Sequence, residues 1–208
     1  SKYAVKIAVD MVKETLNTKK EAVLRIDPNS LDTLLHPTLN EKSLVNVIAS
    51  GLPASPGAAS GKVVFSSEEA ERLNDMMQDT ILVRVETSPE DIHGMHAAKG
   101  ILTARGGMTS HAAVVARGMG RPCVSGSSEI DINYEAKTFK TSSTEIKEGD
   151  IITIDGSTGR IILGEVPTVK PEISGDFSKL MSWADGFRKL KVRTNSETPL
   201  DTKTARDF

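Results

Sequence analysis

The chain has 208 residues, with 26 Lys and Arg against 28 Asp and Glu, which gives a formal net charge of −2. This balance, with an aromatic content of only 4%, gives no reason to expect a nucleic-acid partner, because such proteins use basic surfaces and stacking aromatics. The single cysteine, Cys123, excludes an internal disulfide, and because no apolar run approaches the ~20 residues that span a bilayer, we expect a soluble, intracellular-type protein with no membrane partner.

Residues 1–50 are expected to form a helical tail or linker. Five apolar residues follow the spacing of one face of an amphipathic helix: Val5, Ala8, Val9, Val12 and Leu16. A second helix is expected over residues 19–25, and a short third one begins at Pro28. These helices lack the apolar surface for a core of their own, so we interpret them as the edge of a neighbouring domain.

A compact α/β core is predicted over residues 51–167. It begins with a stretch rich in Gly, Pro and Ser over residues 51–61, which we interpret as a linker or structured loop. Short strands and helices then alternate, and the helices are expected over residues 67–76, 88–97 and 111–119. Residues 138–166 have an all-β pattern, with a hairpin turn at Asp155–Gly159. Residues 168–208 are expected to be a second linker, with a helix over 177–187 and a strand over 189–195.

The segment with the clearest chemical potential joins a buried strand to an apolar helix. Gly106 and Gly107 allow a tight turn, and Thr109 or Ser110 can cap a helix whose first turn holds His111. A helix N-terminus binds anions through its free N–H groups, and its partial positive charge favours the neutral, nucleophilic form of a nearby imidazole. His111 is therefore a candidate nucleophile for phosphoryl transfer, although such a histidine is more often a cap or a packed side chain.

The sequence around this histidine resembles the phosphohistidine signature of the phosphoenolpyruvate-utilising enzymes: RGGMTSHAAVVARGMGRPCVSG, residues 105–126. The resemblance extends to GLPASPGAA at residues 51–59 and to VRVETSPED at residues 83–91. Residues 1–37 resemble the helical tail of an ATP-grasp half, and residues 177–208 resemble a connector into a phosphoenolpyruvate-binding barrel. The resemblance implies an α/β fold, specifically a swivelling β/β/α phosphohistidine domain over residues 51–167 with a helical N-terminal linker and a C-terminal linker.

Within the family, the signature is most similar to the dikinase branch. Phosphoenolpyruvate synthases and sugar-phosphotransferase enzyme I usually carry Arg in place of Met108, and synthases tend to carry Cys in place of Ser110. The resemblance therefore implies the carrier domain of an enzyme that converts ATP, pyruvate and inorganic phosphate to AMP, phosphoenolpyruvate and pyrophosphate. Two alternatives stay open: the carrier domain of a phosphoenolpyruvate synthase, which uses water as acceptor, and a phosphate-binding or interaction module without turnover.

The resemblance also implies roles for individual residues. His111 would carry the phosphoryl group, with contacts from Gly107, Thr109, Ser110 and Arg105. Thr109 matches a threonine that a regulatory kinase/phosphatase modifies in plant and bacterial relatives. We expect a structural role for Arg117, which lies on a different face of the helix, and buried packing for Cys123.

The cofactor and partners implied by the resemblance lie outside this chain. Mg²⁺ would bind to the ATP-grasp and barrel domains of a parent that forms a homodimer in the cytoplasm, a plastid or a glycosome, and the fragment alone could not turn over. The parent would bring ATP, phosphate, pyruvate and phosphoenolpyruvate to the carrier. Within the chain, His93 and His96 are spaced i, i+3 on an expected helix with Asp91 nearby. Surface pairs of this kind are ordinary, so we expect no metal there.

Overall fold

The computed structural model describes residues 2–32, 34–39, 45–169 and 175–191, together with the isolated positions 193, 199, 202, 203 and 206. Two compact units are present: residues 28–173 form one, and residues 2–27 together with 174–208 form the other. None of the described helices is long and apolar enough to cross a membrane.

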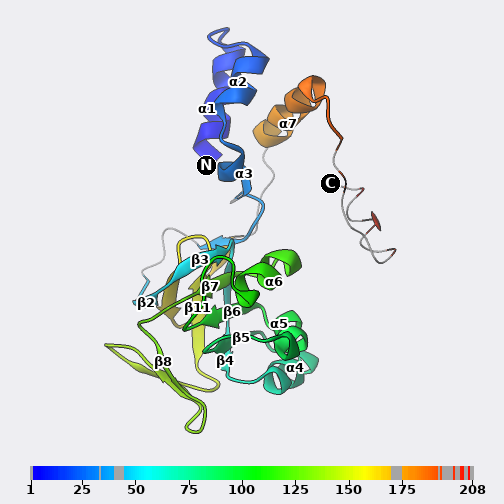
Figure 1. Cartoon of the computed structure of the whole chain (residues 1–208). Coiled ribbons are helices and arrows are strands. Elements are labelled where there is room, and N and C mark those ends of the chain that lie inside the picture. Colours follow the sequence, from blue (N-terminus) through cyan, green and yellow to red (C-terminus); the bar gives the residue numbers. More distant parts are fainter. Residues whose placement is uncertain are drawn as a thin grey trace. The chain divides into compact units, whose positions relative to one another are not determined.

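The larger unit is built on an eight-stranded mixed sheet with the strand order β2-β12-β11-β4-β5-β6-β7-β3 (Figure 1). The four central strands, β4 to β7, are parallel, and the outer strands pair antiparallel to their neighbours. The bounds of these strands are β2 (Val47–Ser50), β3 (Leu52–Ser55), β4 (Ala58–Val64), β5 (Thr80–Arg84), β6 (Gly100–Thr103), β7 (Cys123–Ser125), β11 (Ile151–Asp155) and β12 (Arg160–Leu163).

Three helices follow the parallel strands and lie together on one side of the sheet (Figure 1): α4 (Ser67–Asp75), α5 (Ile92–Ala97), which the 3₁₀ turn η1 (Pro89–Asp91) precedes, and α6 (His111–Met119). Alternate residues along a strand point to opposite faces, so each parallel strand contributes to two cores. Val64, Leu82 and Ile101 are buried in the apolar cluster that contains the helix residues. The sheet therefore has one helix-covered face.

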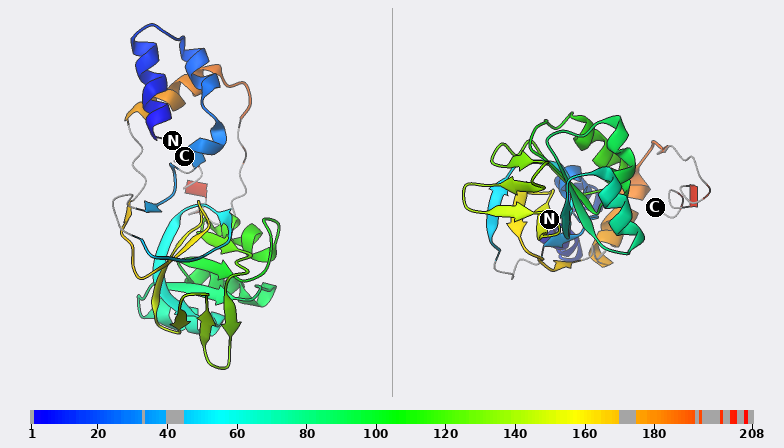
Figure 2. Two further views of the ribbon diagram at one scale, coloured as in Figure 1. Left: turned by 90° about the vertical axis from the view of Figure 1, so that its left-hand side faces the viewer. Right: turned by 90° about the horizontal axis from the view of Figure 1, so that it is seen from below.

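The second core lies between the large sheet and a three-stranded antiparallel sheet, which we call the ribbon. The ribbon consists of β8 (Asp131–Asn133), β9 (Thr138–Lys140) and β10 (Glu145–Lys147). Phe139 and Ile146 of the ribbon are buried in one cluster with Val63, Val83 and Leu102 of the large sheet. The right-hand view of Figure 2 shows the ribbon strands and the helices on opposite sides of this unit. The layers are thus β, β and α, and the fold is the mixed α/β fold expected from the sequence.

Two expectations for the flanks of the core are wrong. Residues 47–50 are not helical but form β2, which pairs with β12, and β1 (Thr38–Leu39) pairs with β13 (Thr168–Val169). Residues 52–55, inside the stretch interpreted as a linker or loop, form β3. Partners far along the chain set these strands, and no local pattern reveals them. Pro53 is compatible with β3 because that strand lies at the edge of the sheet.

The smaller unit contains α1 (Lys2–Lys13), α2 (Lys19–Arg25) and α7 (Gly175–Phe187), and the three helices pack on one another. Val9 and Ala22 are fully buried and Leu180 is nearly so. The N-terminal helices were expected to lack the apolar surface for a core of their own, and they form one with the help of α7 from the other end of the chain. The short helix α3 (Pro28–Asp32) belongs to the larger unit.

The strand expected over residues 189–195 is not found at the described positions 189–191 and 193. Residues 192, 194 and 195 lie outside the described part of the chain.

Candidate functional site

The candidate site lies at the carboxyl ends of three neighbouring parallel strands. Thr87 follows β5, the loop of residues 104–110 follows β6, and Ser125 is the last residue of β7. In α/β sheets, ligands bind outside the carboxyl ends of parallel strands, because the loops and helix N-termini converge there. The segment that the sequence analysis singled out, residues 105–111, lies at this edge of the sheet.

The loop after β6 is held in a tight conformation. The Thr103 hydroxyl donates to the Arg105 carbonyl oxygen at 2.8 Å, and Gly106 has a φ of 111°, which favours glycine. Gly126, after β7, has a φ of 64°, and a Cβ placed there would lie 2.3 Å from the Gly106 carbonyl oxygen. Two backbone segments meet closely at these glycines, and their contact fixes the approach to α6.

The helix α6 begins in the way the sequence predicts. Ser110 is its N-cap, with extended backbone angles, and the Ser110 hydroxyl accepts a hydrogen bond from the Ala113 N–H at 3.4 Å. The same hydroxyl lies 3.4 Å from the Ser125 hydroxyl at the end of β7. His111 is the first helical residue, so its side chain lies where the free N–H groups and the helix dipole favour an anion.

The His111 ring is oriented by a residue from the neighbouring strand end. Its Nδ1 lies 3.0 Å from the Thr87 Oγ1, within hydrogen-bond distance, and the side chain is half-buried. Its Nε2 makes no hydrogen bond to any other described residue. One ring nitrogen is therefore occupied, and the other has no hydrogen-bond partner among the described residues.

The other residues singled out from the sequence differ in their surroundings. Thr109 and Arg105 are exposed, and neither side chain makes a polar contact within the described part of the chain. Around Gly107 there is open space where a side chain would begin. The Arg117 side chain donates hydrogen bonds to two backbone carbonyl groups: its Nε donates to that of Ala113 at 3.1 Å, and its Nη2 donates to that of Met108. Arg117 thus ties the loop to α6.

Sequence reasoning missed Thr87 and Ser125 as site residues. Both lie at or just beyond the end of an expected strand next to the one that precedes His111, and this position was the available signal. The segment containing Thr87 was recognised as family-like, but no role was given to its hydroxyl. The contact with His111 spans 24 residues of sequence, which no local motif encodes.

The described residues offer no donor set for a metal ion. No group of three or more His, Cys, Asp and Glu side chains with suitable placement occurs among them. Asp91, the carboxylate near His93 and His96, is buried and accepts hydrogen bonds from the Ser67 hydroxyl and the Ser88 N–H, both at 2.9 Å. Its role is to fix the start of α5.

Cys123 is fully buried within the apolar cluster beneath the helices. Burial raises the pKa of its thiol to about 12. Since the thiolate is the reactive form of cysteine, this residue is a packing residue in the folded chain.

Comparison with known proteins shows what this part of the chain is similar to. Residues 76–159 match the sequence profile of the family described as "PEP-utilising enzyme, mobile domain". The matched residues include β5 to β7, the loop after β6 and α6, so the candidate site lies inside the part of the chain that is similar to this family.

More particularly, the chain is homologous to a part of pyruvate, phosphate dikinase. It is 60% identical to that of Rhizobium meliloti over 208 residues, 59% identical to that of Clostridium symbiosum over 204 residues, and 54% identical to pyruvate, phosphate dikinase 2 of Zea mays over 208 residues. These alignments cover 97–100% of the chain but only 23–24% of each relative, so the chain spans about a quarter of their length.

Among solved structures, aconitase X of Thermococcus kodakaraensis aligns with 56% of this chain and 98% of its own, at 17% identity and a TM-score of 0.35. A likeness this weak supports no statement about function.

Proposed function

We propose that this chain is the phosphoryl-carrier segment of a pyruvate, phosphate dikinase. In the longer protein, His111 takes a phosphoryl group that derives from the β-phosphate of ATP, and inorganic phosphate accepts the γ-phosphate. His111 then transfers its phosphoryl group to pyruvate at a second site. The observation that carries the proposal is a histidine at the N-terminus of α6 with one ring nitrogen free, in a chain homologous to part of these enzymes.

The free nitrogen supports Nε2 as the acceptor atom in this proposal. Because Nδ1 is occupied by the Thr87 hydroxyl, attack on phosphorus falls to Nε2. The lone pair of Nε2 is available only in the neutral tautomer with its proton on Nδ1, so the Thr87 Oγ1 must accept a hydrogen bond from the Nδ1–H. The N–H groups at the start of α6 and the Ser110 hydroxyl then lie beside the incoming phosphoryl oxygens.

The remaining predicted contacts fit the same step. The backbone N–H of Gly107 and the side chain of Arg105 belong to the loop that precedes α6, and a guanidinium can bind phosphate oxygens in a bidentate manner. Arg105 has no competing polar partner among the described residues. Thr109 is the site at which a regulatory kinase/phosphatase acts in this proposal.

Mg²⁺ belongs to the other domains in this proposal. The described residues contain no fitting group of carboxylate or histidine ligands, so no step on this chain passes through the metal. The ATP-grasp and barrel domains of the same parent are the carrier's partners, in the cytoplasm or in a plastid.

The test uses a chimera in which this chain replaces the aligned segment of the Rhizobium meliloti dikinase. We expect label from the β-phosphate of ATP to appear on the protein as an acid-labile, alkali-stable phosphoramidate, and the variant His111→Ala to abolish it. The variant His93→Ala is the matched control and should label normally. Retained labelling of His111→Ala would refute the proposal.

Phosphate dependence separates the dikinase from the synthase. We expect turnover of the full-length protein, with its own flanking domains, to need inorganic phosphate and to release pyrophosphate. In a protein that contains its own natural flanking domains, turnover without phosphate would instead support a phosphoenolpyruvate synthase.

A further inference from the structure

The loop between β5 and η1, residues 85–88, is tethered on both sides of Thr87. On one side, the Val85 N–H donates to the Tyr134 hydroxyl oxygen at 2.7 Å. On the other side, the Ser88 N–H donates to the Asp91 carboxylate at 2.9 Å. Thr87 lies between two anchored backbone positions, which restricts where its hydroxyl can be.

Tyr134, which holds Val85, also contacts Arg84, and Arg84 forms an ion pair with Asp91. The Arg84 guanidinium carbon lies 5.1 Å from the centroid of the Tyr134 ring, within the range of a cation–π contact. The Arg84 Nε lies 3.5 Å from the Asp91 Oδ1, and its Nη1 donates to the Phe65 carbonyl at 3.0 Å. Asp91 is only 5% exposed and the Arg84 side chain is 27% exposed, so the pair is shielded from water on the carboxylate side. Tyr134, Arg84 and Asp91 thus form one connected group, the loop clamp.

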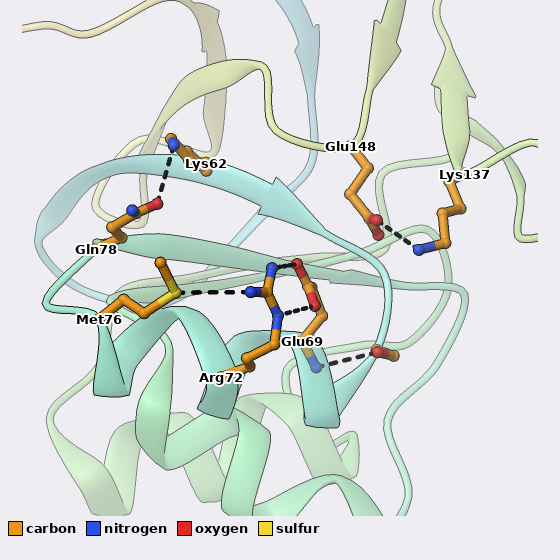
Figure 3. A network of polar contacts seen from close by, with 8 residues as sticks. Lys62, Glu69, Arg72, Met76, Gln78, Lys137 and Glu148 are labelled. Carbon is orange, nitrogen blue, oxygen red and sulfur yellow. Dashed lines mark hydrogen bonds and ion pairs between the residues drawn. The ribbon is translucent and has the colours of Figure 1, made fainter.

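Tyr134 comes from the ribbon, a different layer of the fold from the helix that carries His111. The turn that presents it is itself fastened: the Lys137 ammonium group lies 2.6 Å from the Glu148 carboxylate (Figure 3), and the Glu148 N–H donates to the Lys137 carbonyl at 2.9 Å. Asn133 also accepts a hydrogen bond from the Ala136 N–H at 2.9 Å. The ribbon can therefore hold a fixed position for the Tyr134 hydroxyl.

We propose that the loop clamp, and Tyr134 in particular, is a positioning device for the phosphoryl acceptor. It holds residues 85–88 so that the Thr87 hydroxyl accepts from the His111 Nδ1–H and keeps the Nε2 lone pair free. This inference rests on the proposed function of His111, and it gives the three-stranded ribbon a part in the chemistry. Tyr134 touches neither the ring nor the phosphoryl group, so it acts only through Thr87.

The chemical need for this device follows from the transfer step. A bond forms between Nε2 and phosphorus while the donor P–O bond breaks, and the electron pair of that bond leaves on the oxygen. The Nδ1 proton stays, so the imidazole ring gains positive charge as the bond forms. A hydroxyl oxygen held at Nδ1 stabilises this charged ring, and it does so best when it is placed before the reaction.

The test reads the protonation state of the ring directly, by ¹⁵N NMR of the whole chain with labelled histidine at pH ~8.5, where histidines of ordinary pKa near 6.5 are neutral. The variant Tyr134→Phe removes the hydroxyl and keeps the aromatic ring over Arg84. The chain has a second tyrosine, Tyr3, which is 77% exposed on α1, so Tyr3→Phe is the same chemical change without the clamp.

We expect His111 in the unmodified chain and in Tyr3→Phe to be almost entirely in the Nδ1–H tautomer. In Tyr134→Phe the ratio of the Nδ1–H to the Nε2–H form should fall about fivefold or more, as expected for the loss of one hydrogen bond. Thr87→Val should lose the preference fully, and Thr87→Ser, which keeps the hydroxyl, should restore it. An unchanged tautomer ratio in Tyr134→Phe, with the amide spectrum of the core preserved, would overturn the proposal.

A second readout separates this inference from the proposed function. In the dikinase chimera, Tyr134→Phe should slow the phosphorylation of His111 by about fivefold and reach the same final level. The tautomer experiment needs no phosphoryl donor. If labelling persists in His111→Ala, the carrier role fails, while the tautomer ratio still decides whether the clamp positions the ring.

Discussion

Thr109 is the residue at which charge should decide whether His111 can react. It is exposed and lies two residues before the histidine, next to the positive end of α6. A phosphate there would add about −1.5 to −2 charges, which would occupy the anion-binding helix end and repel the incoming phosphoryl group. A modification at Thr109 would therefore block the reaction of His111 through its charge.

We predict that Thr109→Glu folds normally but accepts phosphate at least about tenfold more slowly than the unmodified chimera. Thr109→Val should have a smaller effect, because it removes a hydroxyl without adding charge. The measurement is the initial rate of labelling from ATP in the dikinase chimera. Equal rates for the two variants would show that charge at this position does not switch the carrier.

Cys123 gives a prediction about reactivity and pH. Because burial raises the pKa of its thiol to about 12, it should resist iodoacetamide at pH 8 in the folded chain and react readily in denaturant. The ordinary thiol pKa is about 9, so the stability that comes from keeping this thiol neutral is present below pH 9 and is lost as the pH rises toward 12. Mass spectrometry measures the alkylation, and rapid modification of the folded protein would contradict the buried environment.

At the residue scale, the sequence was informative where the chemistry is local. The helix start at His111, with a cap at Thr109 or Ser110, could be predicted because the turn, the cap and the histidine lie within six residues of one another, whereas the role of His111 rested on the family resemblance. Thr87, Ser125 and Tyr134 could not, because sheet pairing and a second layer bring them to the site from distant parts of the chain. The positions of Thr87, Ser125 and Tyr134 near His111 therefore depend on the tertiary structure.

At the element scale, the contact between the loop after β6 and the end of β7 can be tested with alanine. Gly126→Ala places a Cβ 2.3 Å from the Gly106 carbonyl oxygen at a φ of 64°, so the free energy of unfolding should fall by about 1–3 kcal/mol. Gly107→Ala, in the loop after β6, meets no atom within 4 Å and should change the free energy of unfolding by less than ~0.5 kcal/mol. Urea denaturation of both variants measures the difference, and equal stabilities would show that the close approach is not required.

Helices and strands with a clear hydrophobic pattern or turn signal in their own sequence could be predicted well. The helix α6 and the hairpin of β11 and β12 lie where the sequence pattern places them. The strands β2 and β3 did not follow from the sequence, since each has four residues and one contains Pro53, and their partners β12 and β7 lie about 70 to 110 residues away. Short edge strands depend on a partner that supplies half of their hydrogen bonds.

At the scale of the whole molecule, the proposed function has the carrier reach two separate sites, and hinge motion of this kind is absorbed by a few loop residues. We predict that a disulfide pinning the residue 51–167 core to the nucleotide lobe of the chimera spares the phosphorylation of His111 by ATP and blocks transfer to pyruvate. Reduction of the disulfide should restore the second half-reaction. If both half-reactions proceed while the core is pinned, the carrier does not swivel.

Helices from the two ends of the chain, α1 and α2 from one and α7 from the other, pack on one another. The apolar stripe of α1 predicted a buried face, but the sequence did not show that α7, more than 160 residues later, would cover part of it. The Lys19 ammonium group lies 5.9 Å from the centroid of the Trp183 ring and adds a cation–π contact between α2 and α7. An apolar stripe shows that a partner is needed, and only the fold identifies it.

In the proposed function, Nε2 of His111 carries the phosphoryl group. The most direct measurement is ³¹P–¹⁵N coupling in the phosphorylated chimera, labelled with ¹⁵N-histidine and kept at alkaline pH, with phosphopeptide mapping to locate the residue. The structure predicts one phosphohistidine, at His111, with phosphorus bonded to Nε2 and the proton retained on Nδ1. Phosphorus on Nδ1, or on His36, His93 or His96 in place of His111, would contradict it.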